Sequence, residues 1–352
     1  MTVTTSATGS DMLAVARRAI GDGRPDDYTL APTRHAAELG VRAPALGTIL
    51  SGSRVEAAAA EFERHDAVAV EAQSEFKRTA LRANRAVLLT ACLSALMLVV
   101  GPFDTLSGID SARRLVLGIL GALSVVGGGL TTMWLYQLKQ GHLLERWNQA
   151  RAHAETGRLD YFQRVLESTT ASGGDPPIDL LLLEYFRRYQ LDVQVAFYGR
   201  RAREHARAAD RTLRMEAFAV LLATVGAGLG GMLAFAADRP EYAAMAAIGV
   251  LGAALAAYAA TFEAINQDRR NAERYERTLT TLLALRERLD EVRAAAATGN
   301  REPVLRFMEA VNEQLSLEHR EWLESSESMR TSLGLLESAL QQSRPPAEPR
   351  GG

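Results

Sequence analysis

The sequence predicts an all-α membrane protein with two transmembrane helical hairpins, hence four spans, and long cytoplasmic helices that form a bundle or a coiled-coil region. Three observations predict this fold class: uncharged apolar runs of bilayer length, short polar turns that pair these runs, and helical periodicity elsewhere. A helix needs roughly 20 apolar residues to cross a hydrocarbon layer of about 30 Å. The predicted spans are residues 86–106, uncharged up to Phe103, and residues 115–138, 217–237 and 242–262.

Buried helices of a large soluble protein are the alternative, because they also lack charges. Such helices are usually shorter and keep a polar stripe, whereas these runs are apolar on every face. The alanine-rich run 242–262 is the least hydrophobic, and it is the one that could line a bundle instead of facing lipid.

The distribution of basic residues predicts the orientation. Lys and Arg lie before, between and after the hairpins, with only Arg113, Arg114 and Arg239 in the turns. The positive-inside rule then places both termini and the middle segment in the cytoplasm. The basic residues nearest to the spans agree: Lys77, Arg78, Arg82, Arg85, Arg269, Arg270 and Arg274.

Composition shifts divide the chain. We expect a mobile N-terminal arm at 1–52, a first unit at 53–170, a linker at 171–177, a second unit at 178–296, a C-terminal helix at 303–342 and a disordered tail at 343–352. Within the arm, Gly40 lies at the turn of a helix-turn-helix-like pattern. Its second helix, Ala43 to Leu50, offers almost no polar side chain for base edges, so a coincidental pattern is favoured over DNA binding.

The two units show the same order of basic helix, hairpin and charged helix. After each hairpin comes a similar polar signature, WNQARAHAE at 147–155 and INQDRRNAE at 265–273. Because the Asn-Gln, Arg and Ala-Glu positions recur in register, at the same place relative to each hairpin, we predict an internal duplication.

Each signature carries a pair of opposite charges, Arg151 with Glu155 and Arg269 with Glu273. Residues four apart share one helical face. The pairs are either solvated or hold the hairpins in register through interhelical contacts. Trp147 is either an anchor at the membrane interface or a core residue.

These signatures, the basic helix ahead of each hairpin and the C-terminal sequence FMEAVNEQLSLEHREW resemble the SLATT family, two-transmembrane modules associated with SMODS and SLOG proteins. In the C-terminal sequence, Glu313, Glu318 and Trp322 are similar to the closing helix of that family. The resemblance covers roughly Arg54 to Leu323, as two units in tandem.

The resemblance implies a membrane effector of a bacterial conflict or antiviral defence system, located in the inner (cell) membrane. It implies that copies of the chain oligomerise and form a pore or perturb the bilayer when a nucleotide-sensing or nucleotide-synthesising partner protein triggers them. A non-conducting membrane scaffold that recruits a cytoplasmic partner through its helices is the alternative. A soluble helical bundle is a third possibility.

Small residues in the spans favour close helix packing. Gly226 and Gly230 form a G-x-x-x-G pattern, and Gly249 and Gly252 each precede an alanine by four residues. Such residues serve either association between copies or packing within one chain. The last helix has an apolar stripe that either packs on the protein's own helices or sets the register of an oligomer: Val304, Met308, Val311, Leu315, Trp322, Met329 and Leu336.

Other chemistry is not expected. With 40 basic and 42 acidic residues, bulk charge does not draw the chain to nucleic acid. The single cysteine and scattered histidines make no metal site, and the glycine-rich runs lack the Lys-Ser/Thr of a phosphate cradle. We expect no enzyme and no cofactor. We also expect no ion relay within the apolar runs, because residues 86–103, 115–138, 217–237 and 242–262 contain no Asp, Glu, Lys, Arg or His.

Overall fold

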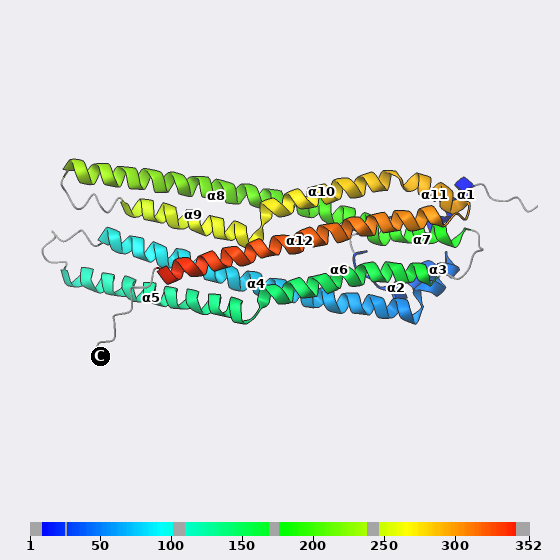
Figure 1. Ribbon diagram of the computed structural model, residues 1–352, viewed down its shortest axis with the longest axis horizontal. Coiled ribbons are helices and arrows are strands. Elements are labelled where there is room, and N and C mark those ends of the chain that lie inside the picture. Colours follow the sequence, from blue (N-terminus) through cyan, green and yellow to red (C-terminus); the bar gives the residue numbers. More distant parts are fainter. Residues whose placement is uncertain (1–8, 25–26, 101–109, 169–175, 238–245, 343–352) are drawn as a thin grey trace, which may run out of the picture. The chain divides into compact units, whose positions relative to one another are not determined.

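The computed structural model describes residues 9–24, 27–100, 110–168, 176–237 and 246–342. All regular structure in these ranges is helical (Figure 1). The helices are α1 Gly9–Ile20, α2 Pro32–Gly40, α3 Pro44–Leu50, α4 Ser53–Val100, α5 Asp110–Gln140, α6 Leu143–Glu167, α7 Ile178–Phe186, the π-helix η1 Arg187–Asp192, α8 Val193–Ala237, α9 Ala246–Asn266, α10 Asp268–Glu287, α11 Leu289–Ala297 and α12 Glu302–Gln342. The predicted all-α class with four membrane-length helices is confirmed.

The chain folds as two compact units. We call the first the charged unit, formed by Met1–Ala72, Glu145–Glu204 and Arg270–Glu324. We call the second the apolar unit, formed by Gln73–Leu144, His205–Arg269 and Ser325–Gly352. Both halves of the sequence contribute to both units, so the compact units do not follow the two sequence units 53–170 and 178–296.

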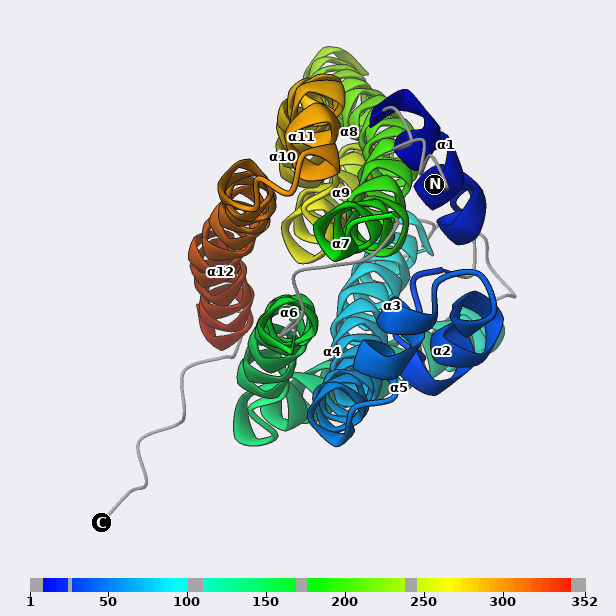
Figure 2. The same ribbon diagram turned by 90° about the vertical axis from the view of Figure 1, so that its right-hand side faces the viewer.

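The core of the charged unit forms around α7. Its sequence, IDLLLLEYF, has apolar residues on all sides, and every residue except Asp179 is buried. Helix α7 contacts α1, α3 and α11, while α2 packs against α3 (Figure 2). The apolar stripe of α12 is buried in the same unit from Val304 to Trp322, which supports packing on the protein's own helices. The side chains of Met329 and Leu336 lie outside the described residues.

The N-terminal region differs from the expected mobile arm. Residues 9–50 contain α1, α2 and α3, and Ala16, Leu46 and Leu50 are fully buried in the core. Helices this short gain their stability from tertiary burial and not from propensity, which hides them in the sequence. At the turn between α2 and α3, a Cβ on Gly47 would lie 2.8 Å from the Cα of Gly40, so glycine permits the close contact.

The apolar unit contains both hairpins. In the most apolar stretch of each membrane-length helix, only 11–22% of the residues are buried. Large apolar side chains are therefore exposed along α5 and α8, among them Leu115, Ile119, Val125, Phe218, Leu221 and Met232. A surface of this kind is typical of helices that contact lipid, because soluble monomers rarely expose contiguous apolar patches of this extent.

Glycines hold α8 against α9. A Cβ on Gly226 would overlap the backbone nitrogen of Gly249, and a Cβ on Gly252 would overlap that of Ala223. A Cβ on Gly230 would lie 2.8 Å from the nitrogen of Ala246. The packing glycines predicted from the sequence therefore serve the contact within the hairpin.

Polar contacts support the first hairpin and join it to the second. The hydroxyl oxygens of Ser94 on α4 and Ser124 on α5 are 3.3 Å apart. The buried side-chain amide of Asn84 on α4 donates to the carbonyl of Tyr258 on α9 at 3.1 Å. Where water is absent, such hydrogen bonds favour specific helix pairs.

A left-handed residue ends α5 and another ends α9. His142, with φ of 46°, separates α5 from α6, and Gln267, with φ of 52°, separates α9 from α10. The second break lies within the predicted second unit 178–296. Asn148 follows the first break by six residues, whereas Asn266 directly precedes the second, so the signatures do not lie at the same place relative to their hairpins.

Alanine at Gly226 should lower the thermal unfolding midpoint, because its Cβ would overlap the α9 backbone and overpacking costs about 1–3 kcal/mol. Alanine at Gly228 is the matched control, since nothing lies within 4 Å of a Cβ there. It should be neutral or stabilising by up to about 1 kcal/mol, because glycine is a poor helix former. Circular dichroism of the detergent-solubilised protein measures both midpoints, and equal shifts would contradict the glycine contact.

Candidate functional site

Several predicted signature residues meet inside the charged unit. We call this group the signature cluster, and it consists of Trp147 and Arg151 on α6, Tyr198 on α8, Arg274 on α10, and Glu318 and Trp322 on α12. The cluster joins four helices, and it combines the first post-hairpin signature with the C-terminal signature.

The aromatic part of the cluster is an edge-to-face pair. The ring centroids of Trp147 and Trp322 are 5.1 Å apart at 69°, and both side chains are buried. The guanidinium carbon of Arg151 lies 4.4 Å from the centroid of the Trp322 ring. Trp147 is thus a core residue and not an anchor at the membrane interface.

The charged part centres on a buried carboxylate. Glu318 lies 3.2 Å from the Nε of Arg274, and it accepts a hydrogen bond of 3.2 Å from the hydroxyl of Tyr198. Burial raises the pKa of the Glu318 carboxyl, although Arg151 and Arg274 favour its charged form. Arg151 also lies 4.0 Å from Glu155, so the predicted pair of the first signature is present at the edge of the cluster.

The other predicted signature residues do not enter this core. Glu273 and Glu313 are exposed on the surface of the charged unit. Arg269 is exposed in the apolar unit, where its backbone N–H donates to the Glu263 carboxylate at 2.9 Å. Sequence analysis missed Arg274 as a member of the cluster. On α10 the buried residues recur every three or four positions, at Asn271, Arg274, Thr278 and Leu282. This helical spacing is the signal that places Arg274 on the buried face.

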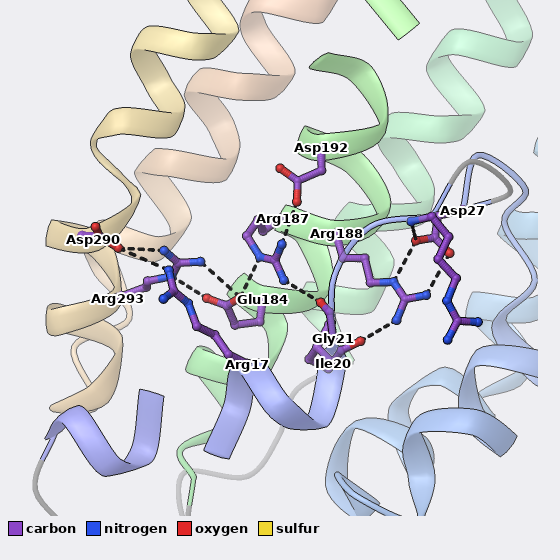
Figure 3. Close-up of polar contacts among 11 residues, drawn as sticks. Arg17, Ile20, Gly21, Asp27, Glu184, Arg187, Arg188, Asp192, Asp290 and Arg293 are labelled. Atoms are coloured by element: carbon purple, nitrogen blue, oxygen red, sulfur yellow. Dashed lines mark hydrogen bonds and ion pairs between the residues drawn. The ribbon is translucent and has the colours of Figure 1, made fainter. Parts of the chain in front are cut away.

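A second polar network surrounds the π-helix (Figure 3). Arg187 donates to Glu184 and Asp192, each at 2.7 Å, and to the carbonyl of Gly21 at 2.8 Å. Arg188 donates to the Asp27 carboxylate at 2.8 and 3.0 Å. The two adjacent arginines therefore fasten the N-terminal segment to the start of the long helix that continues as α8.

Two further arginines extend this network. Arg293 on α11 donates to both Glu184, at 2.5 Å, and Asp290, at 2.7 Å. Arg158 on α6 is fully buried and donates to the carbonyls of Tyr28, at 2.9 Å, and Tyr189, at 2.8 Å. Since a π-turn displaces carbonyls from their usual i+4 donors, the bond to Tyr189 stabilises the π-helix itself.

The arrangement of these buried polar side chains holds helices together. Among the described residues, no group of His, Cys, Asp and Glu could hold a metal ion. His35 is fully buried, and it shares a hydrogen bond of 2.8 Å with Tyr185, which in turn shares one of 2.6 Å with Tyr161. These side chains lie in the apolar core, where they pack and form hydrogen bonds with one another.

Glutamine at Glu318 should destabilise the charged unit by about 3–5 kcal/mol, because it leaves Arg274 buried without its carboxylate. Glutamine at Glu313, an exposed glutamate of the same sequence signature, should change the free energy of unfolding by less than about 0.5 kcal/mol. Denaturant unfolding followed by tryptophan fluorescence reports on the cluster directly, since Trp147 and Trp322 lie in it. Equal effects of the two substitutions would show that the cluster carries no stability.

Asparagine at Asp27 should destabilise the protein by about 3 kcal/mol at neutral pH, because Arg188 loses a buried partner. Burial opposes the charge of Asp27, but the hydrogen bond from Arg188 holds the pKa of the carboxyl below 3.8. This contribution is therefore present above pH 3.8 and is lost as the pH falls through the lowered pKa, so the difference from the unsubstituted protein should shrink in acid.

The control for Asp27 is the exposed pair Arg277–Glu321, whose closest atoms are 3.2 Å apart. Glutamine at Glu321 should cost less than about 1 kcal/mol, since water screens this pair. A loss at Glu321 as large as that at Asp27 would show that burial does not set the strength of these ion pairs.

Comparison with known proteins identifies part of the chain. Residues 186–322 match the family model of SMODS and SLOG-associating 2TM effector domain 1, SLATT_1. No curated protein and no solved structure matches the chain. The match contains Tyr198, Arg274, Glu318 and Trp322 of the signature cluster, whereas for residues 53–170 the same family stays a prediction. Residues 186–322 of this chain are therefore similar to a SLATT domain.

Proposed function

We propose that this protein is a membrane effector whose hairpins associate between copies and form a pore or perturb the bilayer. SLATT domains are effector domains associated with conflict and defence systems, and they are not a known enzyme family. The observation that carries the proposal is the apolar unit, in which the most apolar stretches of four long helices leave 78–89% of their residues unburied. We place it in the inner membrane of a bacterium, with both termini in the cytoplasm.

Faces of α5 and α8 remain available for association. Nothing lies within 4 Å of a Cβ on Gly121 or Gly128 of α5, or on Gly228 and Gly231 of α8. These positions differ from the glycines that close the second hairpin, so contacts between copies need not open it. Small residues allow such helices to approach closely.

The polarity of a pore would come from hydroxyl and backbone groups. Thr132 on α5 and Thr224 on α8 are exposed, and each hydroxyl donates to a carbonyl one turn earlier, at 3.0 and 2.9 Å. The apolar runs carry no Asp, Glu, Lys, Arg or His, so such a pore would not select ions through a charged ring.

We place the trigger at the charged unit. Helices α4 and α8 both belong partly to the charged unit and partly to the apolar unit, so each provides a continuous backbone route from one to the other. A nucleotide-sensing or nucleotide-synthesising partner that shifts helices of the charged unit would thereby act on the spans. In this scheme the buried ion pairs of the signature cluster set the resting arrangement.

A non-conducting scaffold is the second candidate. It is favoured by the use of Gly226, Gly230, Gly249 and Gly252 within the chain, and by the Asn84–Tyr258 bond between hairpins. Both features support a closed bundle of four spans within one copy.

Purified full-length protein should release dye from loaded liposomes, with a steeper than linear dependence on protein density, if copies assemble into pores. Leucine at both Gly121 and Gly128 should reduce this release, because it blocks the unoccupied face of α5. Leucine at Val126, which is exposed on the same helix, is the control and should release dye normally. Absence of release at every density and with every partner would support the scaffold.

A further inference from the structure

Arginines recur with the same spacing on the two helices that lead into the hairpins. On α4 they are Arg78, Arg82 and Arg85, and on α8 they are Arg207, Arg211 and Arg214. The spacing i, i+4, i+7 places each set on one face of its helix, and all six side chains are exposed. We call these sets the arginine faces. Both belong to the apolar unit.

Each arginine face ends where the apolar run begins. Arg85 directly precedes Ala86, and Arg214 precedes Ala217 by three residues. At 1.5 Å per residue, each face extends about 10 Å along its helix. The headgroup layer on each side of a bilayer is about 5–8 Å thick, so arginine side chains on these faces reach its phosphates.

The arginines lack protein partners for their charge. Within the described residues, Arg82, Arg85, Arg207 and Arg214 form no ion pair, and the neighbouring exposed Asp210 forms none either. Arg78 and Arg211 donate their Nε only to carbonyls one turn earlier in their own helices, at 3.1 and 3.2 Å.

The preceding turn of α8 provides a contrast. Arg200 and Arg201 both lie close to Glu204, at 4.0 and 2.9 Å. On α8, ion pairs between arginines and acidic side chains thus end at Glu204, before the first arginine of the face. An unpaired guanidinium next to a membrane span suits a phosphate, to which it can donate two parallel hydrogen bonds.

The helices that leave the hairpins do not carry such faces. Helix α5 has Lys139 as its last basic residue, and α9, which ends at Asn266, contains no Lys or Arg. The arginine faces are therefore a feature of the two entering helices and not of every helix end near the bilayer.

We propose that the two arginine faces bind the headgroups of anionic phospholipids and that the protein prefers membranes rich in them. The inference rests on the membrane location in the proposed function but not on pore formation. Because the faces are exposed along helices next to the spans, lipid headgroups and not free phosphate are the ligand.

The test reconstitutes the full-length protein in nanodiscs of phosphatidylcholine with increasing phosphatidylglycerol, and it measures bound lipid by mass spectrometry after mild release. The unsubstituted protein should retain phosphatidylglycerol over phosphatidylcholine, and salt should weaken this preference. Glutamine at Arg82, Arg85, Arg211 and Arg214 together should lower the preference by about tenfold or more. Glutamine at Arg200 and Arg201, which pair with Glu204, is the control and should leave it unchanged.

Flotation with phosphatidylcholine liposomes after alkaline washing separates the two proposals. Protein that fails to float contradicts the membrane location. Protein that floats but retains both lipids equally overturns the arginine-face inference, as does an equal loss of preference in the control variant. Inorganic phosphate that competes fully with phosphatidylglycerol would also overturn it, because the ligand would then be the free anion.

Discussion

Hydrocarbon offers no hydrogen-bond partners, and this constraint explains how polar groups are arranged in the apolar unit. In the apolar unit the runs 115–138 and 217–237 carry no Asp, Glu, Lys, Arg or His, and hydroxyls such as those of Thr132 and Thr224 donate to their own helix. Specific contact between spans must then come from close backbone approach, as at Gly226 and Gly252, or from a single amide, as at Asn84. The exposed apolar side chains require nothing further once lipid surrounds them.

The charged unit differs from the apolar unit because it buries ionised side chains, which need partners of opposite charge or hydrogen-bond acceptors. Arg158, Arg188, Arg274 and Glu318 are all at most 4% exposed, and each has an oppositely charged or hydrogen-bonding partner. Removing one partner leaves the other charge buried, which is why such networks determine a unique arrangement of helices. Arginine suits this task because its planar guanidinium group donates hydrogen bonds to several acceptors at once, as Arg187 does with Glu184, Asp192 and Gly21.

The spans could be predicted because lipid acts on each residue locally, and a run such as 115–138 shows its environment in composition alone. The N-terminal helices could not, because Ala16 and Leu46 are stabilised by contacts with distant α7 and its neighbours. The same holds for Asp27 and Arg188, which are 161 residues apart. The breaks at His142 and Gln267 also escape prediction, since neither residue is a glycine that would mark a positive φ.

For the candidate site, sequence similarity identified Trp147, Glu318 and Trp322 but could not tell that Glu313 faces outward. The family match begins at Phe186, one residue before the π-helix. The groups that accept hydrogen bonds from Arg187 and Arg188 are the carbonyls of Ile20 and Gly21 and the carboxylate of Asp27, and all three precede the match. The first turn of the matched region is therefore held by a part of the chain outside it. The hydrogen bonds from Arg187 and Arg188 thus fix the start of the helical segment that continues as α8.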